Sequence, residues 1–254
     1  ICSSLDEVVS ELQSRDLSEV ACPYIWLDAT YIKCRNEGHV SSTALVTAIG
    51  ADSDGYRRVL GMDAIDTETY DGWKGFLLSL RERGVAGVLC VTSDAHEGLK
   101  RAVQETYTGS ARQHGIGNRM RKAAGSAPTR QKKGAIFKIL RAGLTEKDHT
   151  LMRELYLLAI EKIEAFCPKA AAVLEEAEPD ALSYLDFPYE HHRRLRTNNI
   201  QERANRELKR RSRVVQVYPS RESPIRMLGA VFSGMDEDLA SVSYTHLTPP
   251  TNRE

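Results

Sequence analysis

The order of the predicted elements in the first half of this 254-residue chain is the feature that most restricts its fold. Three strand-like segments rich in β-branched and aromatic residues come in succession, at Tyr24–Lys33, Val40–Ile49 and Arg57–Met62. A Glu37-Gly38 turn follows the first segment, and Asp52-Ser-Asp-Gly55 follows the second. An Asp-Gly pair suits the positive φ angles of a hairpin turn. The three segments therefore predict an antiparallel meander.

The segments that follow predict a helix, a strand and a second helix. Residues 67–83 carry large apolar residues at helical spacing, and we expect Thr67 to cap this helix and Gly84 to end it. Residues 85–92 are almost entirely apolar, which favours a strand buried on both faces of a sheet. A further helix is expected over residues 97–105.

Three antiparallel strands followed by helix, strand and helix form the skeleton of the ribonuclease-H-like fold, so we expect an α/β protein with a mixed sheet. Residues 1–22 predict an amphipathic helix and a connector before the sheet. Neither period is clear over residues 109–127. Helical periodicity returns over 130–173 as an α-helical insertion, and again over a last helix at 200–213. Residues 214–219 are expected to be extended.

The formal net charge is zero, from 35 basic and 35 acidic residues, but the charges are grouped in blocks. Residues 112–141 hold nine basic residues and no acidic one. Residues 164–190 hold seven acidic residues and one lysine, and residues 191–213 hold nine basic residues against two glutamates. Basic runs are most often solvated surface, but two such blocks could also face a phosphate backbone. Zero net charge therefore does not exclude a nucleic-acid partner.

Other classes of protein are excluded more directly. The chain has no apolar run of about 18 residues, so the sequence predicts no membrane span. It does not open with a signal peptide. Its five cysteines are scattered, with no Cys-x-x-Cys pair, which argues against a disulfide framework and a zinc knuckle. We therefore expect a reducing, intracellular setting, the cytoplasm.

Asp28 lies inside an otherwise apolar and aromatic strand. A buried carboxylate without a partner costs several kcal/mol, so something must compensate it. The carboxylate could accept hydrogen bonds from the backbone or pair with a neighbouring arginine. Alternatively, it could bind a metal ion.

Two further carboxylates could likewise have either a structural or a ligand-binding role. Asp94 ends the buried strand, where open α/β sheets place ligand-binding groups, but Asp94 or Ser93 could instead cap the next helix. Glu202 lies at the start of the last helix, where Asn199 and Glu202 have the form of a capping box.

The three positions taken together favour a metal site. In a ribonuclease-H-like arrangement, the first strand, the end of the fourth strand and a late helix meet at one edge of the sheet. Three clustered carboxylates repel one another and require cations. Oxygen ligands of this kind suit Mg²⁺ or Mn²⁺, which can activate a water or a 3′-hydroxyl in phosphoryl transfer.

The surroundings of Glu202 are compatible with a DNA substrate. Ile200, Ala204 and Leu208 form an apolar stripe that would hold this helix on the core. Asn205, Arg206 and Lys209 share the polar face with Glu202, and many arginines lie in the same region. Basic side chains beside a carboxylate site would bind phosphates and set the register of DNA.

Three long motifs resemble those of bacterial insertion-sequence transposases of the IS256 / Mutator-like family. The first is Tyr-Ile-Trp-Leu-Asp28-Ala-Thr-Tyr-Ile-Lys, and the second is Val-Thr-Ser-Asp94-Ala-His-Glu-Gly-Leu-Lys. The third runs from Phe187-Pro-Tyr-Glu-His-His through Asn-Ile-Gln-Glu202-Arg-Ala-Asn-Arg-Glu to Arg-Val-Val, with Val-Tyr-Pro-Ser after it. The resemblance covers residues 1–111 and 128–240.

The resemblance implies a DDE transposase, a metal-dependent enzyme that cleaves DNA and transfers strands at terminal inverted repeats. Asp28, Asp94 and Glu202 are then the catalytic triad and the ligands of Mg²⁺ or Mn²⁺. The implied partners are the terminal repeats, target DNA and further copies of the chain in a homo-oligomer, in a bacterial cytoplasm near the nucleoid and without a membrane. The residues expected to bind DNA are Arg193, Arg196, Asn199, Arg203, Asn205, Arg206, Lys209, Arg210, Arg211 and Arg213.

The chain departs from the family pattern in three places. The family's sequence-specific DNA-binding region lies before the catalytic core, and this chain has only 27 residues before Asp28. Residues 112–127 lack the tryptophan and the Cys-x-x-His motif that the family places after the second aspartate, as a change of reading frame would produce. Cys167 and His191 do not rebuild that motif. The last residues resemble translated sequencing adapter and are excluded from the fold.

These observations give a division of the chain into six segments. They are a connector helix at 1–22, the first part of the catalytic core at 23–111, an irregular and frame-altered segment at 112–127, a helical insertion at 128–190, the final basic helix with the rest of the core at 191–240, and a non-native tail at 241–254.

Two alternatives to a transposase stay open. One is a nuclease of the same fold, which would cut DNA without transferring strands. The other is an inactive fragment that still binds DNA or associates with a full-length transposase. His96 beside Asp94 could contact a phosphate or could simply be a polar residue at a helix start.

Overall fold

A computed structural model describes seven stretches of the chain, which form two compact units. The described residues are 2–19, 21–36, 38–51, 56–94, 96–144, 148–195 and 199–241, without the side chains of 2–4, 118, 193, 194, 199, 200 and 236–241. The first unit takes its described residues from 1–110 and 198–254, and the second from 111–197. The Asp52–Gly55 turn and the tail from residue 242 lie outside the described residues.

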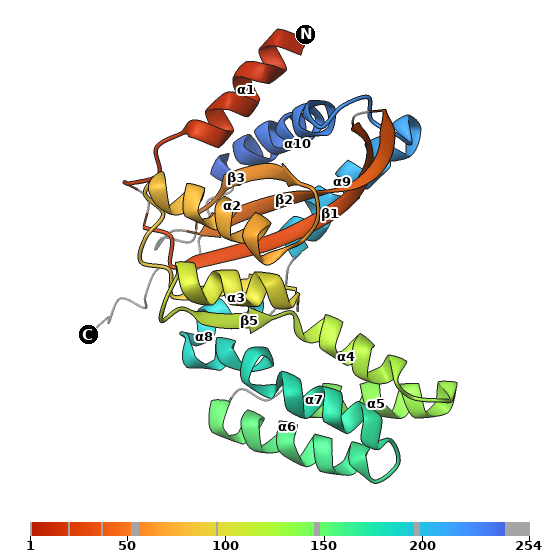
Figure 1. Cartoon of the computed structure of the whole chain (residues 1–254). Coiled ribbons are helices and arrows are strands. Elements are labelled where there is room, and N and C mark those ends of the chain that lie inside the picture. Colours follow the sequence, from red (N-terminus) through yellow and green to blue (C-terminus); the bar gives the residue numbers. More distant parts are fainter. Residues whose placement is uncertain are drawn as a thin grey trace, which may run out of the picture. The chain divides into compact units, whose positions relative to one another are not determined.

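A mixed sheet forms the centre of the first unit, with the strand order β3-β2-β1-β4. Its strands are β1 (Tyr24–Asn36), β2 (His39–Ala51), β3 (Arg57–Ile65) and β4 (Cys90–Ser93). β1 pairs antiparallel with β2, and β2 pairs antiparallel with β3, so the predicted meander is confirmed (Figure 1). β4 pairs parallel with β1, which makes the unit α/β with a mixed sheet.

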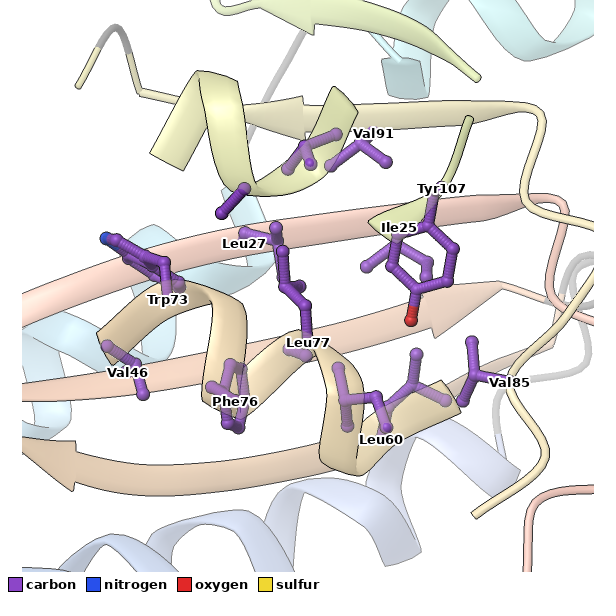
Figure 2. Close-up of a cluster of buried hydrophobic side chains, with 14 of the residues drawn as sticks. Ile25, Leu27, Val46, Leu60, Trp73, Phe76, Leu77, Val85, Val91 and Tyr107 are labelled. Carbon is purple, nitrogen blue, oxygen red and sulfur yellow. The ribbon is translucent and has the colours of Figure 1, made fainter. Parts of the chain in front are cut away.

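Helices cover both faces of this sheet, because successive strand residues point to opposite sides. On one face, Ile25 and Leu27 of β1 join a buried cluster with α2 (Tyr70–Glu82) and α3 (Glu97–Thr106), and Figure 2 shows Trp73, Phe76 and Leu77 of α2 in it.

The opposite face of β1 carries Ile32 and Cys34. These residues pack in a second buried cluster with side chains from three more helices of the first unit. Those helices are α1 (Cys2–Ser14), α9 (Asn199–Val215) and α10 (Glu222–Ser241). The apolar positions Ala204 and Leu208 of α9 are both buried there, as their helical spacing predicted.

A glycine follows the last turn of α2, as predicted. Gly84 has a φ of +105°, its N–H donates to the Arg81 carbonyl, and the Val85 N–H donates to the Leu80 carbonyl. This pair of bonds is a Schellman motif, which satisfies the last carbonyls of a helix. The predicted N-cap was wrong: Thr69, not Thr67, accepts a hydrogen bond from the Gly72 N–H.

The strand predicted at 85–92 is shorter than its apolar run suggested. Only Cys90–Ser93 forms β4, since Gly87 has a φ of +67° that an extended strand does not allow and Leu89 is exposed. Val85 is buried instead as part of the Schellman turn. The capping role considered for Asp94 and Ser93 was wrong, because α3 has its N-cap at His96, without a side-chain cap bond.

The second unit is mostly helical. Its elements are β5 (Ala111–His114), α4 (Ile116–Gly125), α5 (Arg130–Gly143), α6 (His149–Glu164), α7 (Pro168–Ala181), the 3₁₀ helix η1 (Ser183–Asp186) and α8 (Tyr189–Leu195). α7 begins at Pro168, because proline fits the first turn of a helix, where its missing N–H is not needed.

The segment expected to be irregular at 112–127 is regular in the structure, as β5 and α4. Its buried polar side chains misled the periodicity, because they find partners inside the second unit. The Gln113 amide donates to the Ala181 carbonyl and accepts from the Tyr184 N–H. Arg112 forms an ion pair with Asp180.

The end of α9 also differs from the expectation. Residues 214–219 were predicted as extended, but Val214 and Val215 continue the helix with exposed side chains. Gln216, with a φ of +59°, then turns the chain, so that Tyr218 bridges Cys34 at the edge of β1. Periodicity alone could not place the end of α9. The two valines are residues that favour strands, but here they are exposed on the last turn of the helix. None of the described helices is long and apolar enough to cross a bilayer.

Candidate acidic site and its basic helix

The register of two parallel strands brings Asp28 and Asp94 together. The last pair in this register is Trp26 of β1 with Thr92 of β4, and Asp28 and Asp94 each follow two residues later in the chain. β4 ends at Ser93, which leaves Asp94 at the carboxyl end of its strand, with an exposed side chain. The Asp94 charge also acts on the Asp28 carboxyl, consistent with this proximity.

The environment of Asp28 disfavours its charge. Burial raises the pKa of this carboxyl to about 6, and the negative charges of Asp94 and Glu68 add to the effect. Hydrogen bonds act in the opposite direction. The Ala29 N–H donates to Oδ1 at 2.8 Å and the Asn205 amide donates to Oδ2 at 2.6 Å. The backbone hydrogen bond expected from the sequence is therefore present, and Asp28 is half-buried.

Two polar side chains of α9, Asn205 and Gln201, form hydrogen bonds to β1 and β2. Asn205 also accepts a hydrogen bond from the Thr30 hydroxyl at 2.7 Å. One turn earlier, the fully buried Gln201 donates to the Trp26 carbonyl at 2.7 Å. Sequence reasoning missed Gln201, Thr30 and Glu68. Gln201 and Asn205 are four residues apart and so share one helix face, but this spacing alone does not distinguish a packed face from a solvated one.

Glu202 is exposed and lines a cavity of about 450 Å³. Asn205, three residues further along α9, lines the same cavity, so Glu202 lies one turn from the residue that binds Asp28. The other lining residues are Arg206, Lys209, Arg210 and Arg213. Glu202 therefore lies on the same helix as the residue that binds Asp28, but among the described residues it does not join the two aspartates in a cluster of three carboxylates. The capping box considered for Asn199 and Glu202 would involve the side chain of Asn199, which lies outside the described residues.

The remaining predicted DNA-binding positions are placed as follows. Arg203 and Arg211 are exposed on α9, and Arg210 forms an ion pair with Glu207 at 2.8 Å. Asn199 begins α9 and Arg193 lies on α8 in the second unit, while Arg196 lies outside the described residues. His96 is exposed at the N-cap of α3. Asn205 faces Asp28 as well as the cavity.

The two aspartates supply carboxylate oxygens of the kind that a hard divalent cation prefers, but not a complete set of ligands. Among the described residues, no three His, Cys, Asp or Glu side chains are close enough to hold a metal ion. Asp28 and Asp94 do offer carboxylate oxygens from adjacent strands, and their mutual repulsion is what a bound cation would relieve. Each Asp28 oxygen accepts one hydrogen bond and keeps capacity for another ligand.

The first unit combines a mixed sheet, two aspartates on adjacent strands and a basic helix. The sequence of the chain matches the model of the family described as "Transposase, Mutator family" over residues 1–241, and the chain belongs to this family. It is 35% identical to the transposase for insertion sequence element IS406 of Burkholderia multivorans, over 93% of this chain and 60% of that protein.

Two other relatives carry the same kind of description. The transposase for IS1081 of Mycobacterium tuberculosis is 33% identical over 94% of this chain and 57% of its own length. The transposase for IS256 in transposon Tn4001 of Staphylococcus aureus is 30% identical over 94% of this chain and 61% of its own length. The resemblance to the IS256 / Mutator-like family is therefore confirmed. The chain spans about three fifths of the length of these relatives.

Proposed function

We propose that this chain carries the catalytic part of a DDE transposase of a bacterial insertion sequence, with Asp28, Asp94 and Glu202 as the triad. The parallel pairing of β1 with β4, which ends two residues before Asp28 and Asp94, is the observation that carries the proposal. Membership of the Mutator family supports it. The sheet, with three antiparallel strands and a parallel β4, supports a ribonuclease-H-like core.

In the proposed reaction, water hydrolyses a phosphodiester bond at a transposon end and leaves a 3′-hydroxyl and a 5′-phosphate. The 3′-hydroxyl then attacks a phosphodiester of the target strand, forms a new phosphodiester bond, and displaces the target 3′-oxygen as a hydroxyl. Mg²⁺ or Mn²⁺, when bound, would supply the Lewis acidity that activates the attacking oxygen and stabilises the leaving one. Asp28 and Asp94 would hold it, and Glu202 would complete the site from α9. Arg206, Lys209 and the other basic residues of α9 would bind the phosphates beside the reacting bond.

The test is Mg²⁺-dependent nicking and strand transfer on a duplex that ends in the terminal inverted repeat of the encoding element. We expect the chain to nick this duplex at the repeat end and Asp94→Asn to fall to background. Equal activity in the two proteins would refute the triad. Nicking without joined products would indicate a nuclease, and binding without nicking would indicate an inactive DNA-binding fragment.

Lys209 and Arg213 are the best-placed phosphate ligands, because both line the Glu202 cavity and a second cavity of about 680 Å³ beside it. The second cavity is also lined by Tyr31 and Lys33 of β1. Replacing Lys209 and Arg213 together by alanine is expected to weaken DNA binding and to lower the slope of log K against log salt by about 2, since each phosphate contact contributes about 0.9. Fluorescence anisotropy at several salt concentrations measures this slope.

The control removes two positive charges elsewhere in the first unit. Lys74 and Arg101 both pair with Glu105, at 2.9 Å and 3.0 Å. Their double replacement by alanine changes the net charge equally but should leave the salt slope unchanged. The same change of slope in both double variants would mean that net charge, rather than the surface of α9, attracts DNA.

A further inference from the structure

We propose that Asn205 is a positioning residue, which holds the Asp28 carboxylate in one orientation and fixes it to the helix that carries Glu202. The inference deepens the proposed function and rests on it. Among the described residues, Asn205 joins α9 to the acidic side chain of β1, because its Nδ2 donates a hydrogen bond to Asp28 Oδ2 at 2.6 Å.

The orientation of the Asn205 amide is itself fixed. Its Oδ1 accepts from the Thr30 hydroxyl at 2.7 Å, and Thr30 is buried. Turning the amide over would place Oδ1 against the carboxylate oxygen, where two acceptors repel each other. Thr30, Asn205 and Asp28 therefore form a chain of hydrogen bonds with a single favourable direction.

The Asp28 carboxylate is held from two sides. Its Oδ1 is fixed by the N–H of Ala29 in its own strand, and its Oδ2 by Asn205 from α9. An amide suits this task because it donates a hydrogen bond without a positive charge. A lysine or arginine would neutralise Asp28 and compete with a cation for it.

The same bond sets the position of Glu202. Gln201 and Asn205 both bind β1, so α9 cannot slide or rotate without breaking these contacts. Glu202 lies between them in the sequence, on the side of the helix that lines the cavity with Asn205. The polar face of α9 therefore does more than face solvent and DNA. It sets the distance between the helix and the aspartates.

Mn²⁺ binding to the 254-residue chain without DNA, measured from the free Mn²⁺ signal in electron paramagnetic resonance, tests the inference. We expect Asn205→Ala to weaken Mn²⁺ binding by about 10- to 100-fold, the usual effect of removing a partner that orients a metal ligand. Glu207→Gln is the matched control on the same helix, since Glu207 pairs with Arg210 and not with Asp28. It should bind Mn²⁺ as the unmodified chain does.

A second variant keeps the test valid if Asn205→Ala fails to fold. Thr30→Val is close in shape, leaves the Asn205 amide unfixed, and should weaken Mn²⁺ binding by a smaller factor. The double variant should bind no more weakly than Asn205→Ala, because residues of one network are not additive.

The outcomes separate the two proposals. Unchanged Mn²⁺ affinity in Asn205→Ala, or in Thr30→Val if the first does not fold, overturns the positioning role and leaves the triad in place. If the unmodified chain binds no Mn²⁺, the proposed metal site falls and the inference falls with it. A lower melting temperature with unchanged Mn²⁺ affinity would show that the hydrogen-bond chain is only structural.

Discussion

Replacing Asp28 by asparagine is expected to abolish metal-dependent DNA cleavage and, at the same time, to stabilise the fold at neutral pH. Loss of a metal-binding carboxylate should reduce nicking by about 10³-fold, equivalent to about 4 kcal/mol in the barrier. The gain in stability follows from the pKa of Asp28, which burial and the neighbouring acids raise to about 6. A carboxylate whose charge destabilises the fold is typical of a functional site.

The sign of the pH dependence is set by that raised pKa. The contribution of Asp28 to stability is fully present below its ordinary pKa of 3.8 and is lost as the pH rises through about 6, where the folded protein must hold a disfavoured charge. Asp28→Asn removes this loss. The new amide nitrogen cannot accept the bond from Ala29 or Asn205, which costs about 1 kcal/mol at any pH. The free energy of unfolding of Asp28→Asn should therefore lie below that of the unmodified chain near pH 4 and above it at pH 7.5, and the difference should change by at most about 3 kcal/mol between the two. Urea unfolding without divalent ions at both pH values measures the difference.

Asp94→Asn is the matched comparison for this prediction. Its side chain is exposed, so the substitution should remove cleavage equally but change the stability at pH 7.5 much less. Retained cleavage in Asp28→Asn, or a stability at pH 7.5 below that of the unmodified chain, would contradict the assignment.

The meander could be predicted from the sequence because its signals are local. Each strand of the meander alternates its side chains between two covered faces, and turn residues separate the strands. The apolar run before β4 was misread for the opposite reason. Val85 is apolar because it packs beside Leu80 in the turn after α2, and Leu89 is exposed, so neither residue belongs to a strand. Periodicity does not distinguish these causes.

The candidate site was predictable to a different extent. Asp28 and Asp94 could be expected near each other from the order of elements, since the first strand of this arrangement is adjacent and parallel to the fourth. The hydrogen bonds of Gln201 and Asn205 could not be predicted, because on an arginine-rich helix two amides look like part of a solvated face. Asn205 and Asp28 are 177 residues apart, and only the packing of Ala204 and Leu208 decides that Asn205 faces β1.

Gly84 follows α2 and packs against the segment before β1. Its replacement is expected to cause a large loss of stability. A Cβ at this position would lie 2.4 Å from both Cα and N of Ser18, in a backbone that cannot retreat. Leu17 next to it is fully buried and its N–H donates to the Arg83 carbonyl at 2.7 Å. The φ of +105° adds strain of about 1–2 kcal/mol for any residue with a Cβ.

We expect Gly84→Ala to lower the free energy of unfolding by about 3 kcal/mol or more, the sum of this strain and the forced displacement of Leu17. Gly87→Ala is the control, because Gly87 also has a positive φ, +67°, but a Cβ there meets nothing within 4 Å. Its loss should stay near 1 kcal/mol, the strain alone. Urea unfolding of both variants separates the two contributions. Equal losses would mean that the contact with Ser18 relaxes freely, and that Gly84 is required only for its backbone conformation.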